Sequence, residues 1–211
     1  IHYPDSAERL AEARRRLAMD GRLRAALEGA PRDRIVLSAP MIDLPRPSTT
    51  MPVRILIRTL RLLGMGGQYV PGGNGALVGT TTFVNNPLTS DPVRYARNAA
   101  ILEEDPTLGI GSPTVAWADT AFRAMHTFRG VTYPSEIRQP ILMLAASSDT
   151  IVSTAAIEEF AYHLRAGAHL VIAGSRHEIL QEQDRYRGQF WAAFDAFVPG
   201  KRPPASVPLW L

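Results

Sequence analysis

Residues 140–154 read PILMLAASSDTIVST, and residues 169–178 read HLVIAGSRHE. Each stretch starts with a short apolar run that predicts a buried β-strand, and each run leads into a polar loop. The first loop carries Asp149 and the second carries His177. A third apolar run spans residues 34–39. Buried strands that alternate with helices predict an α/β fold with a mostly parallel sheet. Asp149 and His177 both fall beyond the carboxyl ends of strands, where such sheets form their sites.

Helical patterns fill most of the remaining chain. We expect helices over residues 5–28, 53–63, 93–102, 114–128, 153–164 and 184–197. The last helix carries aromatic side chains that we expect to pack against the sheet: Tyr186, Phe190, Trp191, Phe194 and Phe197. No convincing strand interrupts the block between residues 45 and 134.

This order of predicted strands and helices divides the sequence into four segments. They are an arginine-rich N-terminal helix (1–32), an α/β core (33–44 and 135–198), a helical insertion (45–134) and a proline-rich tail (199–211).

Composition excludes several classes of function. Without cysteine the chain has no disulfide and no thiolate metal site, which fits a reducing compartment. His2, His126, His163 and His169 show no metal-ligand spacing, so we expect no metal and no cofactor. The basic side chains cluster only near the N-terminus, where arginines alternate with glutamates, so we expect no nucleic-acid binding. No apolar run approaches the roughly 18 residues of a membrane span, and a cytoplasmic or peripherally membrane-bound protein is expected.

Six short motifs run in an order that resembles bacterial lysophospholipases of the monoacylglycerol-lipase-like α/β-hydrolase group. They are Val36-Leu-Ser-Ala-Pro-Met-Ile-Asp43, Leu88-Thr-Ser-Asp-Pro92, Gly109-Ile-Gly-Ser-Pro113, Pro140-Ile-Leu-Met143, Ser148-Asp149-Thr-Ile-Val152 and Arg176-His177-Glu178. The resemblance covers about residues 33–198. It implies a partial α/β-hydrolase fold in which residues 45–134 form a helical cap. It also implies that Asp149 is the acid and His177 the general base of a catalytic triad, acting on a lipid ester.

The resemblance fails at the nucleophile. The family's serine lies in a Gly-x-Ser-x-Gly turn before the first of these motifs, and the 211 residues contain no such pentapeptide. Ser38 lies within an expected strand, Ser112 within the insertion, and Ser148 beside Asp149. None follows a strand-to-helix elbow, so the nucleophile remains unassigned. We expect that the N-terminal half of the family's fold is missing or replaced here.

The insertion suggests two kinds of binding site. By resemblance, Leu60, Trp117, Phe122 and Met125 would line an acyl-chain pocket, although simple packing between cap helices explains apolar residues equally well. The glycine-rich loop from Gly64 to Gly79 lacks the phosphate-binding pattern Gly-x-x-x-x-Gly-Lys-Ser/Thr, so we expect a flexible cap loop.

Two hypotheses about function follow. The first is a serine ester hydrolase that acts on lysophospholipids or monoacylglycerols through Asp149, His177 and a serine not recognised here. The second is a truncated, hydrolase-derived chain without catalysis that serves as a binding module or is a degenerate product. The missing elbow favours the second for this chain, and the intact Asp149 and His177 loops favour the first for its lineage.

With only three apolar strands, one sheet edge would be open, which predicts marginal stability or a homodimer through that edge.

Overall fold

The computed structural model describes residues 34–76 and 82–198. The chain divides into two compact units, Ile1–Arg34 and Ile35–Leu211, and all the elements named below lie in the second. The helix expected over residues 5–28 and the tail expected from residue 199 lie outside the described residues.

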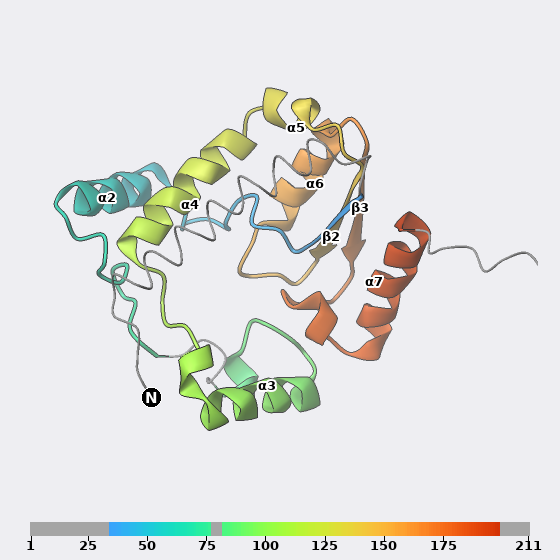
Figure 1. Cartoon of the computed structure of the whole chain (residues 1–211), viewed down its shortest axis with the longest axis horizontal. Helices are drawn as coiled ribbons and strands as arrows, with labels where there is room; N and C mark the ends of the chain where they lie inside the picture. The colour runs from blue at the N-terminus through green and yellow to red at the C-terminus, as the bar shows by residue number, and fades with distance from the viewer. Residues whose placement is uncertain (1–33, 77–81, 199–211) are drawn as a thin grey trace, which may run out of the picture. The chain divides into compact units, whose positions relative to one another are not determined.

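The second unit contains a parallel three-stranded sheet, two strands of which, β2 and β3, are labelled in Figure 1. Its strands are β1 (Ile35–Ser38), β2 (Ile141–Ala146) and β3 (Gly167–Ile172), in the order β1-β2-β3. Ile35 pairs with Ile141, and Ile141 pairs with Gly167. The predicted α/β class with a parallel sheet is therefore confirmed.

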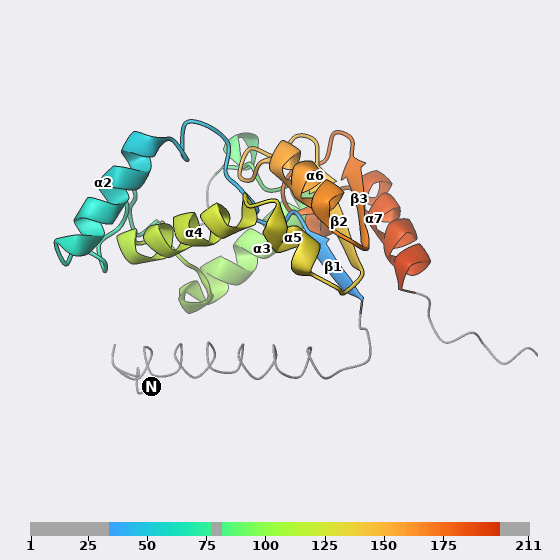
Figure 2. The ribbon, with the colours of Figure 1, turned by 90° about the horizontal axis from the view of Figure 1, so that it is seen from above.

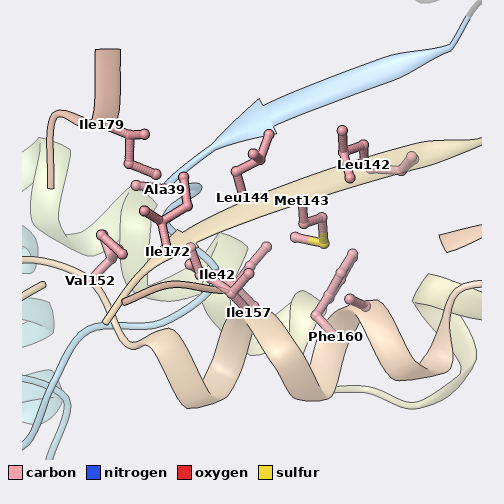
Figure 3. Close-up of a cluster of buried hydrophobic side chains, with 14 of the residues drawn as sticks. Ala39, Ile42, Leu142, Met143, Leu144, Val152, Ile157, Phe160, Ile172 and Ile179 are labelled. Atoms are coloured by element: carbon pink, nitrogen blue, oxygen red, sulfur yellow. The ribbon is translucent and has the colours of Figure 1, made fainter. Parts of the chain in front are cut away.

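The middle strand, β2, lies in the hydrophobic core. All six residues of β2 are buried, as expected of a central strand covered on both faces. Met143 points from β2 toward α6 (Thr154–His163), where Ile157 and Phe160 lie (Figure 3). Burying a side chain of this size contributes about 1.5–3 kcal/mol, so this contact between β2 and α6 is a main source of stability.

Helix α7 (Asp184–Phe197) covers the other face of the sheet (Figure 1). Four of its five aromatic side chains pack as predicted, with Phe190 buried and Tyr186, Phe194 and Phe197 partly buried against the core. Trp191 differs, because it is 44% exposed, and its ring lies beside those of its helical neighbours Phe190 and Phe194.

The outer strands are less covered than their apolar sequences predict. Three residues of β1 are half-buried and Ser38 is exposed. The first three residues of β3 are exposed, and only Ile172 is fully buried. Cover on both faces is thus a property of β2 alone among the described strands.

The chain between β1 and β2 is helical, as predicted. It contains α2 (Met51–Leu62), α3 (Pro92–Glu104), α4 (Val115–Phe128), α5 (Thr132–Glu136) and the 3₁₀ turns η1 (Phe83–Asn85) and η2 (Pro106–Leu108). Side-chain caps explain two of the starts, because Asp91 accepts from the N–H groups of Val93 and Arg94, and Thr114 accepts from that of Trp117. The sequence did not predict α5, since Pro134 reads as a breaker. Pro134 is tolerated there because N–H groups in a first helical turn have no intrahelical partner.

Helices α2 and α4 lie side by side (Figure 2). Ile57 of α2 and Val115 and Ala118 of α4 form a second, smaller buried cluster. The loop after α2 strengthens this pairing, because the N–H groups of Val115 and Ala116 donate to the carbonyls of Gln68 and Gly66. The predicted cap loop is thus partly ordered by the start of α4.

Candidate active site

Asp149 and His177 meet at the carboxyl edge of the sheet. Asp149 follows β2, which ends at Ala146, and His177 follows β3, which ends at Ile172. Because β2 and β3 are adjacent and parallel, the loops after them leave the sheet at the same edge. The two loops also bind each other, since the Gly174 N–H donates to the Ser147 hydroxyl at 2.7 Å.

The Asp149 carboxylate is fully buried and fully hydrogen-bonded. One oxygen accepts from the backbone N–H groups of Ile151 at 2.7 Å and Val152 at 3.0 Å. The other lies 2.8 Å from Nδ1 of His177. Burial acts to raise the pKa of Asp149, but the hydrogen bonds from His177, Val152 and Ile151 outweigh it and hold that pKa below its ordinary value. Asp149 is therefore an anion at neutral pH.

Asp149 does not cap the helix that follows it. Ser153 takes that position, and its hydroxyl accepts from the Ala156 N–H at the start of α6. The carboxylate of Asp149 is thus left to orient His177, which agrees with the sequence-based preference for Ser153 as the cap.

The His177 imidazole is held at one nitrogen and partly open to solvent. Its side chain is 25% exposed, and its hydrogen bond to Asp149 is the one that the ring makes among the described residues. An anionic partner at Nδ1 favours the tautomer with the proton on that nitrogen, which leaves Nε2 as a proton acceptor. This arrangement suits a general base.

Glu178 adds a second ionisable group beside the histidine. Burial raises the pKa of Glu178 above its ordinary value, and the nearby charge of His177 opposes this only in part. Its backbone N–H donates to the Leu88 carbonyl at 2.8 Å, which fixes the chain directly after His177.

The three serines weighed as nucleophiles lie in three different segments, and Ser148 directly precedes Asp149. Ser38 is the exposed last residue of β1, and Ser148 is exposed in the turn after β2. Ser112 lies in the loop before α4, where its hydroxyl accepts from the Asn74 N–H. Among the described residues, no serine hydroxyl hydrogen-bonds to the His177 ring.

An apolar cavity of about 400 Å³ lies between α2 and α4. Two of the four side chains predicted to bind an acyl chain, Trp117 and Phe122, line it. The other two do not belong to its lining. Leu60 packs with the small cluster around Ile57, and Met125 is completely buried.

Two other properties concern cofactors and membranes. In the part of the chain that the structure describes, no group of three or more His, Asp or Glu side chains could hold a metal ion. Within the same residues, no helix has both the length and the apolar character that crossing a membrane requires.

Sequence reasoning missed Glu182, a completely buried carboxylate that contacts the histidine loop. It follows η3 (Ile179–Gln181) and accepts from the Arg176 N–H at 2.8 Å. Its sequence context, Gln181-Glu182-Gln183, is polar and gives no sign of burial. Its side-chain partner Ser90 lies 92 residues away, so no local pattern could have found it.

Comparison with known proteins identifies similar sequences. A family model described as serine aminopeptidase, S33, matches residues 23–184. Lysophospholipase L2 of Escherichia coli K12 is 28% identical over 167 residues, which cover 74% of this chain and 47% of the relative. The probable lysophospholipase L2 of Haemophilus influenzae is 27% identical over 168 residues, covering 79% and 51%. The chain thus spans about half the length of these curated relatives.

Solved structures show the same fold. A soluble variant of monoglyceride lipase from Saccharomyces cerevisiae superposes with a TM-score of 0.57 at 16% identity, covering 77% of this chain and 54% of the lipase. A carboxyl esterase from Bacillus coagulans gives 0.58 at 17% identity, covering 82% and 58%. A family-model match over most of the chain establishes that this chain belongs to the serine aminopeptidase S33 family, and the three-stranded parallel sheet with its flanking helices is part of an α/β-hydrolase fold.

Proposed function

We propose that this chain is part of a serine ester hydrolase of the lysophospholipase or monoacylglycerol lipase type. The observation that carries the proposal is the 2.8 Å contact between Asp149 and Nδ1 of His177 at the carboxyl edge of the sheet. The similarity to lysophospholipases supports the choice of a lipid ester, and family membership favours an enzyme over a non-catalytic binding module.

In this proposal His177 moves protons and Asp149 orients it. Nε2 of His177 takes the proton of a serine hydroxyl as the serine oxygen attacks the ester carbonyl. The resulting tetrahedral intermediate releases the alcohol, which receives the proton from His177, and leaves an acyl-enzyme. Water then repeats the sequence and frees the fatty acid. Asp149 stabilises the imidazolium throughout and stays ionised.

The serine of this mechanism is not assigned to a residue. The proposal requires a hydroxyl at Nε2 of His177, and no Gly-x-Ser-x-Gly turn is present in residues 1–211. That turn also provides a backbone N–H for the oxyanion hole, and losing one such donor costs about 100- to 1,000-fold in rate.

We further propose that residues 45–134 act as the cap and that the cavity between α2 and α4 receives the acyl chain. The cavity is lined mostly by apolar side chains, which suit a hydrocarbon. Trp117 and Phe122 are the two predicted residues that fit this role. Leu60 packs against the small cluster around Ile57 next to the cavity, whereas Met125 is buried and lies outside the lining of the cavity.

A fluorophosphonate probe tests the proposal, because it tags only serines that a neighbouring base activates. If a serine within residues 1–211 serves His177, the intact mass of the chain rises by one adduct, and peptide mapping identifies that serine. His177→Ala should abolish the adduct. His169→Ala should not, because His169 lies on β3 with only a long 3.9 Å contact to Glu158. No adduct on a folded sample would contradict catalysis by this chain alone.

A further inference from the structure

Glu182 is a buried carboxylate that accepts four hydrogen bonds. One of its oxygens accepts from the N–H groups of Ser90 at 3.0 Å and Arg176 at 2.8 Å. The other accepts from the Ser90 hydroxyl at 2.6 Å and the Gln183 N–H at 3.1 Å. A buried carboxylate is costly unless such donors surround it, so four donors converging on Glu182 mark a specific structural role.

The donors come from two segments that are far apart in the chain. The Arg176 guanidinium donates to the carbonyls of Asn86 at 2.9 Å and Thr89 at 3.1 Å. The Thr89 hydroxyl donates to the Gln181 carbonyl at 2.8 Å. Residues 86–90 and 176–183 are therefore joined by hydrogen bonds along their length, with Glu182 buried at the junction.

His177 lies within this junction. The N–H before it, on Arg176, is held by Glu182, and the N–H after it, on Glu178, is held by the Leu88 carbonyl. Neither partner is hydrogen-bonded to the imidazole, whose ring nitrogen Nδ1 lies against Asp149. They fix the backbone from which the ring reaches Asp149, so they can set the direction of that ring.

Residues 86–91 are held by hydrogen bonds of their own, so they can anchor the histidine loop. The Asn86 side chain accepts from the N–H groups of Leu88 and Thr89, and Asp91 caps α3. Arg94 then links α3 to the start of α7, with contacts of 2.6 Å to Asp91 and 2.7 Å to Asp184.

We propose that Glu182, acting through Ser90 and Arg176, is a positioning residue for His177, so that the Leu88–Pro92 segment controls the geometry of the general base. The proposal rests on the proposed function for its catalytic meaning. It gives a reason for the hydrogen bonds between residues 86–90 and the loop that carries His177, two segments that are far apart in the sequence.

Glu182→Gln provides the test, because it preserves size but turns an amide NH₂ toward a set of donors. The readout is the downfield proton resonance of Nδ1 of His177, which reports its bond to Asp149. His177→Ala assigns the resonance by removing it. In Glu182→Gln we expect this proton to exchange with water at least tenfold faster, or the resonance to vanish, in a chain that still melts cooperatively.

Arg58→Ala is the control, because it removes a 3.0 Å ion pair to Asp119 between α2 and α4 and touches neither Glu182 nor the N–H groups that flank His177. We expect the resonance to survive in Arg58→Ala at a comparable melting temperature. Loss in both variants would mean that Glu182 supports only general stability, and an unchanged resonance in Glu182→Gln would overturn the proposal. So would the absence of the resonance in the unmodified chain.

Two further measurements keep the result decisive. If Glu182→Gln does not fold, Ser90→Ala removes a single donor, and unchanged exchange of the His177 proton in that variant would also overturn the proposal. Fluorophosphonate labelling is scored separately. A chain that shows the resonance but takes no label would contradict the proposed hydrolysis and leave the role of Glu182 in positioning His177 intact.

Discussion

At the scale of single residues, Asp149 links stability to pH. The pKa of Asp149 is lowered in the folded chain, so its contribution is present above the ordinary aspartate pKa and is lost as the pH falls through the lowered value. Asp149→Asn should reduce the free energy of unfolding at pH 7 by about 1–3 kcal/mol, and by less in acid. Urea unfolding over a pH series measures this. Asp195→Asn, on the exposed side of α7, should change little, and a pH-independent loss in Asp149→Asn would contradict the argument.

For Glu178 we expect the opposite dependence of stability on pH. The pKa of Glu178 is raised by burial, so its favourable contribution is present below the ordinary glutamate pKa and disappears as the pH rises through the raised value. Glu178→Gln should match the unmodified chain in acid and exceed it in stability above that range. Thermal melts between pH 4 and pH 8 test this, with the exposed Glu103→Gln as a control. A difference that does not grow with pH would count against a buried, destabilised carboxylate.

The two residues that the sequence identified most clearly, Asp149 and His177, are those whose pairing follows from topology. Each lies after a strand, and adjacent parallel strands bring such loops together. Glu182 could not be identified in the same way, because its burial depends on Ser90, 92 residues earlier. The acyl-site predictions for Leu60 and Met125 could not be made reliably from sequence either, since an apolar residue on a helix can face either a cavity or the interior.

At the scale of elements, the turn between β3 and the histidine loop depends on a glycine. Gly174 has a φ of +81°, and a Cβ there would lie 2.9 Å from the Tyr186 hydroxyl. Gly174→Ala should therefore destabilise the chain by at least about 1 kcal/mol. Gly188, in the middle of α7, has nothing within 4 Å of an added Cβ, so Gly188→Ala should stabilise by up to about 1 kcal/mol. Melting temperatures that moved in the same direction for both variants would refute this contrast.

Most elements could be predicted because their signals are local. The helix expected over residues 93–102 is Pro92–Glu104 in the structure, and the one expected over 114–128 is Val115–Phe128. Strand β3 starts earlier than its apolar run, because Gly167 and Ala168 pair with β2 through their backbones whatever their side chains. Elements that depend on tertiary contacts for their stability, such as the short α5, left no such signal.

At the scale of the whole chain, the order of predicted strands and helices was enough to predict the fold class. The order of the six short motifs was enough to predict the family. The open sheet edge remains a prediction. Among the described residues, β1 pairs with β2 on one side and has no strand on its other side. An unpaired edge offers free N–H and C=O groups to another chain. We therefore expect the 211-residue chain to self-associate through β1.

Matched proline substitutions locate this association. The N–H groups of Ile35 and Ala39 point into the sheet, donating to Pro140 at 2.9 Å and Leu144 at 2.8 Å. Because donors alternate along a strand, the N–H of Val36 faces the open edge and that of Leu37 faces β2. Val36→Pro should lower the self-association measured by sedimentation while leaving the melting temperature nearly unchanged, because proline is accepted on edge strands. Leu37→Pro should instead unfold the sheet. Undiminished association in Val36→Pro would place the contact elsewhere, and a monomer at every concentration would mean that the edge does not pair at all.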